Sequence, residues 1–112
     1  MRKRLAIITC LLLTGCLDTA RLAPEVPVLL EASTVHLDAA LLERGRAVYL
    51  GACTDCHSPV NIRRYSKRDW FGDILPEMSH ESKLDSPDRE ALTAYIRAVM
   101  TIELPTDVTV PD

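Results

Sequence analysis

The sequence predicts a small all-α domain built on about three main helices. Apolar residues recur at helical spacing in three separate stretches, and no strand-like alternation of apolar and polar residues competes with them. The chain has 112 residues, of which 47% are apolar and 26% charged, a composition typical of one folded core. Because a domain of this size buries little surface, a metal, disulfides or a bound cofactor is expected to help stabilise it.

The first main helix is expected to begin after Asp38, whose carboxylate can accept hydrogen bonds from the free N–H groups of the first turn. It should continue to about Leu50 and lead directly into Cys53. Its apolar face is formed by Leu41, Leu42, Gly45, Val48 and Tyr49.

The second helix should begin at the capping box formed by Ser66 and Asp69. It is expected to pass through Trp70 and Ile74 and to end at Pro76, because proline disfavours a helical conformation in the residue before it. The last helix should begin near Ser86 and Pro87, since proline suits a first helical turn, and should extend to about Met100. Its buried stripe is expected to comprise Leu92, Tyr95, Ile96 and Val99.

The N-terminus has the pattern of an export signal over residues 1–15. A basic start precedes an apolar run, Leu5 to Leu13, that is far shorter than the roughly 20 residues of a membrane-spanning helix. Leu13-Thr14-Gly15-Cys16 resembles the bacterial lipobox, in which the cysteine is lipidated and becomes the first residue of the mature chain. We therefore expect an exported protein, lipid-anchored through Cys16 on the periplasmic side of a bacterial membrane. The alternatives are an ordinary signal peptide with an incidental Cys16, or an uncleaved segment.

The rest of the chain divides into a tether, a domain and a tail. Residues 16–36 contain Pro24 and Pro27 without a sustained helical period, which indicates a lipid-anchor site followed by a flexible tether. The domain should cover 37–104, and 105–112 should form a C-terminal tail. Removal of the signal leaves ten Lys and Arg against sixteen Asp and Glu, a net charge of −6, which argues against a nucleic-acid partner.

The segment Cys53-Thr54-Asp55-Cys56-His57 has the pattern of a c-type haem attachment site. Two thiols three positions apart can add to the two vinyl groups of one haem, and the adjacent imidazole of His57 can then bind the iron. With Cys10 removed in the signal and Cys16 lipidated, this reading leaves no cysteine unexplained.

Two other readings of the motif compete with one covalent haem c. A dithiol redox centre at Cys53 and Cys56 would be expected in a βαβ context, which this sequence lacks. A zinc site could use both cysteines with His57 and His80, but adjacent Cys56 and His57 are awkward as two ligands of one tetrahedral ion.

The second axial iron ligand is expected to be Met78, which lies 21 residues beyond His57 and just past Pro76. His80 is its rival, and an open sixth position is a third possibility. His36 lies upstream of the first helix, where we expect it to be exposed.

A basic cluster stands out in this otherwise acidic chain, beside Tyr65 and Trp70. It is either a solvated face, or a set of cations that binds haem propionates or docks an acidic partner. The cluster consists of Arg63, Arg64, Lys67 and Arg68.

Over residues 38–104 the sequence resembles the class I cytochrome c family, and in particular small bacterial monohaem domains. Gly45, eight residues before Cys53, and Tyr95 match positions at which the terminal helices of that family cross closely. The resemblance extends over Arg63, Trp70, Met78, Leu92, Tyr95 and Ile96. Pro76 departs from it, because the subgroup usually continues the helix at this position.

The resemblance implies a small cytochrome c fold of about three main helices around one covalently bound haem. It also implies a one-electron carrier between redox proteins of the periplasm or membrane, and no second haem motif or catalytic constellation suggests an enzyme. The alternatives are a dedicated cytochrome subunit of a periplasmic dehydrogenase, a haem-based ligand sensor with an open sixth site, and a structural lipoprotein without a cofactor.

Overall fold

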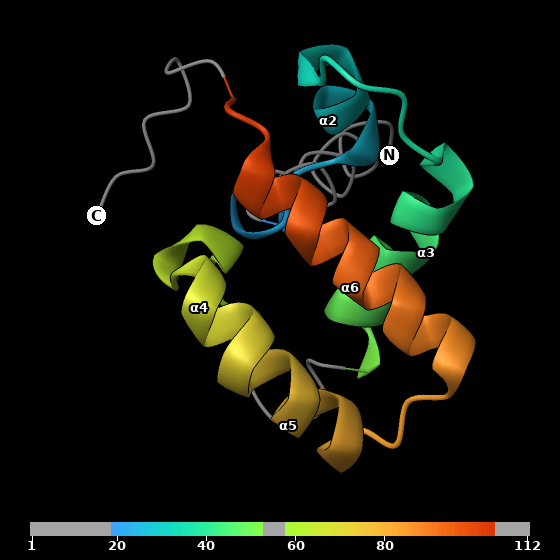
Figure 1. Cartoon of the computed structure of the whole chain (residues 1–112), viewed down its shortest axis with the longest axis vertical. Helices are drawn as coiled ribbons and strands as arrows, with labels where there is room; N and C mark the ends of the chain where they lie inside the picture. Colours follow the sequence, from blue (N-terminus) through green and yellow to red (C-terminus); the bar gives the residue numbers. More distant parts are fainter. Residues whose placement is uncertain (1–18, 53–57, 105–112) are drawn as a thin grey trace, which may run out of the picture.

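The computed structural model describes residues 19–52 and 58–104, and within these ranges it is all-α, with five α-helices and no strand. The prediction of a small all-α domain is therefore confirmed. Figure 1 shows α4 and α5 on one side of the molecule and α3 behind α6 on the other. The helices are α2 (Val26–Ala32), α3 (Ala39–Leu50), α4 (Lys67–Asp69), α5 (Leu75–Glu81) and α6 (Ser86–Thr101), with a 3₁₀ turn η2 (Ile62–Arg64) and a π-helical turn η3 (Trp70–Ile74).

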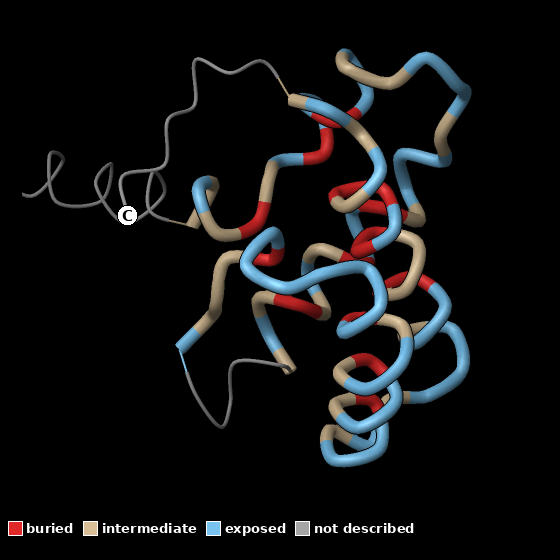
Figure 2. Tube along the Cα trace, turned by 60° about the vertical axis from the view of Figure 1, so that its left-hand side comes forward, coloured by how far each residue is buried: buried red, intermediate tan, exposed pale blue. Residues whose placement is uncertain are grey.

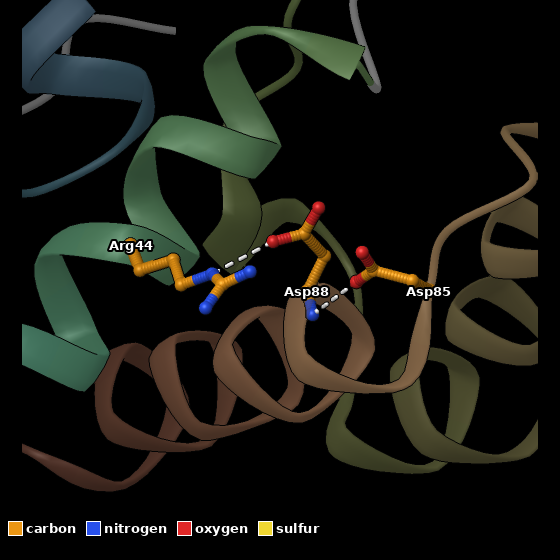
Figure 3. Close-up of polar contacts among 3 residues, drawn as sticks. All are labelled: Arg44, Asp85 and Asp88. Atoms are coloured by element: carbon orange, nitrogen blue, oxygen red, sulfur yellow. Dashed lines mark hydrogen bonds and ion pairs between the residues drawn. The ribbon is translucent and has the colours of Figure 1, made fainter.

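The α3 and α6 helices begin as the sequence predicts. The Asp38 carboxylate accepts a hydrogen bond from the N–H of Leu41 at 3.1 Å, and Asp85 caps α6 by accepting from the N–H of Asp88 at 2.9 Å. The Asp88 side chain also accepts a 2.8 Å hydrogen bond from Nε of Arg44 in α3 (Figure 3). The contact between Arg44 and Asp88 links the start of α6 to α3.

The helix that follows Ser66 does not end at Pro76, so this prediction is wrong. The capping box is present, with the N–H of Asp69 donating to Ser66 Oγ and the N–H of Ser66 donating to the Asp69 carboxylate, each at 3.1 Å. The chain then makes a π turn in which the N–H of Leu75 bonds to the carbonyl of Trp70, five residues back. Pro76 therefore falls in the first turn of α5, where no helical N–H bond is required of it.

The segment expected to be a flexible tether is packed on the domain over much of its length, which corrects that prediction. Residues 26–32 form α2, with Pro27 in its first turn and with Val26 and Leu29 buried. The Tyr95 hydroxyl donates a 2.7 Å hydrogen bond to the Pro24 carbonyl, and Arg46 Nε donates to the Ala23 carbonyl at 3.2 Å. Two apolar residues three positions apart were too short a period to indicate this helix from sequence.

The core lies between α3 and α6 and extends to α2 and α5. Figure 2 shows that the buried stretches alternate with exposed ones along the chain. All four residues predicted for the buried stripe of α6 are buried. Within the described ranges no helix is long and apolar enough to cross a membrane. The largest fully buried side chains are Trp70, Tyr49, Tyr95, Leu29, Ile62, Leu92, Ile96, Val26 and Val99.

Candidate haem-binding site

The attachment motif lies outside the described residues, and so does the lipidation residue Cys16, but the structure fixes both flanks of the motif. α3 ends at Leu50, where the N–H of Gly51 bonds to the carbonyl of Ala47 at 2.9 Å. On the far side, the carbonyl of Val60 accepts a hydrogen bond from the hydroxyl of Tyr49 in α3. The Tyr49 hydroxyl thus links α3 to Val60, eleven residues further along the chain, on the far side of the motif.

An aromatic cluster holds the segment after the motif. Trp70 Nε1 donates a buried 2.7 Å hydrogen bond to the carbonyl of Ile62 in η2. The ring of Trp70 meets the rings of Tyr49 and Tyr65 edge to face, with centroids 6.2 Å and 6.1 Å apart. Because Trp70, Tyr49 and Ile62 are at most 2% exposed, this cluster joins η2, α3 and η3 into one unit.

Arg63 has a structural role that the sequence did not indicate. Its guanidinium donates hydrogen bonds to the carbonyls of Val99 and Ile102 at 3.0 Å and 2.8 Å, at the end of α6. These carbonyls belong to the helix end that lacks intrahelical donors, and the cation also complements the helix dipole there. The rest of the basic cluster, Arg64, Lys67 and Arg68, is exposed, as expected for a solvated face.

Met78 and His80 lie on different faces of α5. Two residues along a helix are about 200° apart, so these two side chains point in nearly opposite directions. Met78 is half-buried and packs against the hydrophobic core, together with Ile74 one turn earlier. His80 is exposed, as is His36 before α3. The burial of the two candidates favours Met78 as a ligand within the fold.

The described residues include side chains that would suit a haem site. Ile62, Leu75 and Ile96 are buried apolar side chains of the described ranges, and Leu84 is half-buried. The thioether of Met78 is a suitable axial donor to haem iron. Within residues 19–52 and 58–104 there is no group of three His, Cys, Asp or Glu side chains that could hold a separate metal ion.

Burial also changes the pKa of Tyr95, which packs against Gly45 of α3 and bonds to the N-terminal segment. Tyr95 is fully buried, and desolvation of the charged form raises the pKa of its hydroxyl well above the ordinary value. The hydroxyl therefore stays protonated and able to donate to Pro24.

Comparisons of this chain with protein-family models, curated proteins and solved structures found no match.

Proposed function

We propose that this chain is a monohaem c-type cytochrome that carries single electrons between redox proteins of the periplasm or its membrane. The observation that carries this proposal is the position of Cys53-Thr54-Asp55-Cys56-His57, immediately after a helix whose Gly45 packs directly against α6. A haem c held there would supply one-electron chemistry between ferrous and ferric iron.

Each protein group then has a defined task. Cys53 and Cys56 hold the porphyrin through thioether bonds, and His57 provides the proximal nitrogen. Met78 provides the sixth ligand, and its half-buried position in α5, against the hydrophobic core, supports this assignment. The apolar side chains of Leu75 and Ile96 exclude water, which favours ferrous iron and raises the reduction potential.

The location of the carrier follows from the N-terminal sequence. The signal over residues 1–15 sends the chain out of the cytoplasm, to the compartment in which c-type haem is attached. Cys16 then anchors it by lipid to the periplasmic side of a bacterial membrane. This position restricts the donors and acceptors to proteins of that compartment or membrane.

The test is to express the full chain in a bacterial host that matures c-type cytochromes. A covalent haem should appear in the denatured protein's mass and in its reduced spectrum, and it should be lost in Cys53→Ala/Cys56→Ala. The matched control is Cys16→Ser, which should keep the haem and leave the membrane fraction. Absence of covalent haem from the wild-type chain overturns the proposal, and rapid carbon monoxide binding to the untreated ferrous protein would replace the carrier by a ligand sensor.

A further inference from the structure

A groove lies between α5 and α6, with a volume of about 780 Å³. In Figure 1 these two helices form a hairpin, joined by the short connection at the bottom of the view. Met78 is absent from the lining, so the groove lies on the flank of α5 that carries Ser79 and His80. It is lined by Phe71, Leu75, Pro76, Ser79, His80, Lys83, Leu84, Arg89, Thr93 and Arg97.

The groove is basic in an acidic protein. His80 of α5 and Lys83, just beyond the end of α5, line one wall, and Arg89 and Arg97 of α6 line the other. None of its described lining residues is acidic, whereas the whole chain has a net charge of −3. An adjoining hollow shares Arg89 and Arg97 and contains Glu90.

The floor of the groove is apolar. Leu75 is buried, Leu84 and Phe71 are half-buried, and all three line the groove. The guanidinium of Arg97 lies 5.2 Å from the centroid of the Phe71 ring, a cation–π contact that holds this cation over the floor. The groove therefore combines apolar contact area with positive charge at its rim.

Lys83 occupies a backbone conformation that glycine would adopt at lower cost. Its φ is 52°, the one positive φ of a residue other than glycine in the described ranges. The position follows the end of α5, where the N–H of Leu84 bonds to the carbonyl of Ser79 at 3.1 Å. A lysine here accepts backbone strain and sets an ammonium group at the rim, which glycine would not provide.

We propose that this groove docks an acidic, amphipathic segment of a protein partner. Arg89, Thr93 and Arg97 occupy successive turns of α6, so the two guanidinium groups arise about 12 Å apart along the helix. A segment with carboxylates on successive turns and apolar residues between them would satisfy both the rim and the floor. A small free anion would engage one cation pair and leave the apolar floor uncovered.

The docking site rests on the proposed function in one respect only, namely that the partner would be a redox protein. Complementary charge steers the encounter of two proteins and sets their relative orientation. The basic cluster at 63–68 is the other candidate surface for an acidic partner. Its Arg63 side chain already donates hydrogen bonds to carbonyls at the end of α6. The groove carries its cations on two walls of a concave site, which favours it over that exposed surface.

The experiment measures binding of a labelled synthetic helical peptide with glutamate on three successive turns and leucine beside each. The full chain, purified in zwitterionic detergent, should raise the fluorescence anisotropy of the peptide at low salt and release it at high salt. Arg89→Gln/Arg97→Gln should weaken binding about tenfold, equivalent to about 1.4 kcal/mol. The control of equal charge change is Lys67→Gln/Arg68→Gln, which should bind within about twofold of the wild type.

Lys83→Gly separates loss of the ammonium group from loss of the fold. Because glycine relieves the positive φ, this variant should melt at the same or a higher temperature while it binds the peptide more weakly. The proposal is overturned if the control pair weakens binding as much as the groove pair, or if the wild type does not bind. Displacement of the peptide by soluble short-chain phosphatidylglycerol at lower concentration would assign the groove to a lipid headgroup instead. Haem absorbance of the same samples reports on the proposed function independently of peptide binding.

Discussion

Gly45 of α3 lies so close to α6 that a Cβ atom placed on it would come within 2.6 Å of the Cβ of Tyr95. It would also collide with the carbonyl of Ala91, a backbone group that no side-chain rotation can move. The closeness of the two helices therefore depends on the missing side chain.

Gly45→Ala should lower the free energy of unfolding by about 3 kcal/mol, because the helices must separate to admit the methyl group. Urea unfolding followed by circular dichroism measures this loss. The control is Gly72→Ala, since a Cβ there meets no atom within 4 Å and alanine is favoured over glycine in a helix. An equal loss in both variants would show that the crossing tolerates a side chain.

Met78→Ala should abolish the weak far-red sulfur-to-iron band of the oxidised protein and lower its reduction potential, because the thioether favours ferrous iron. The control is His80→Ala, at an exposed position on another face of α5, which should leave both properties unchanged. Optical spectra and voltammetry of the two variants measure the difference. A wild-type protein that lacks this band, and whose potential changes in His80→Ala but not in Met78→Ala, would make His80 the sixth ligand.

Alkaline stability should depend on Tyr95. Because burial raises the pKa of the folded-state hydroxyl, the unfolded chain loses this proton first, near the ordinary value of 10.0. The resulting stability is fully present below pH 10 and is lost as pH rises above it. The free energy of unfolding, measured from pH 8 to 11, should therefore fall more steeply for the wild type than for Tyr95→Phe. Tyr65→Phe, at an exposed position, is the control. Parallel curves would refute this role.

Acid stability should depend on the capping box. Hydrogen bonds from the Ser66 side chain and backbone hold the pKa of Asp69 below its ordinary value of 3.8. This contribution is present above pH 3.8 and is lost as pH falls through the lower folded-state pKa. Thermal melts from pH 5 to 2 should show a shallower decline for Asp69→Asn than for the wild type. The neighbouring exposed variant Asp73→Asn is the control, and a decline equal to that of Asp69→Asn would count against the assignment.

The indole N–H of Trp70 should contribute to the stability of the segment after the motif. Trp70→Phe leaves the buried carbonyl of Ile62 without its donor and opens a small cavity, at a cost of about 3 kcal/mol in the free energy of unfolding. Tyr65→Phe, at an exposed position beside the same ring, should change it by less than about 0.5 kcal/mol. Chemical denaturation of both variants provides the measurement.

The features of the fold that were predictable from sequence are local ones. Asp38 begins α3, and Ser66 with Asp69 begins α4, because a side chain two or three residues away can satisfy the first N–H groups of a helix. The buried stripe of α6 was predictable because Leu92, Tyr95, Ile96 and Val99 follow the helical period over about two turns.

The features that the sequence did not indicate depend on distant contacts or on backbone register. Pro76 is an ordinary helix breaker unless a π turn precedes it, and no side chain marks such a turn. Pro24 is held by a hydrogen bond from Tyr95, 71 residues away. At the candidate site, the same proline obscured the position of Met78 within α5, whereas the attachment motif was recognisable from its spacing alone.

The packing of α2 has a consequence for how the carrier would travel. Because residues 23–32 pack on the domain, only the few residues before them could act as a linker to the proposed lipid at Cys16. The three residues that precede residue 19 span about 10 Å when extended. A domain held so closely by a lipid would not reach far into the periplasm. Its search for partners would be two-dimensional diffusion along the bilayer, with exchange favoured toward proteins that present their redox centres near the same surface.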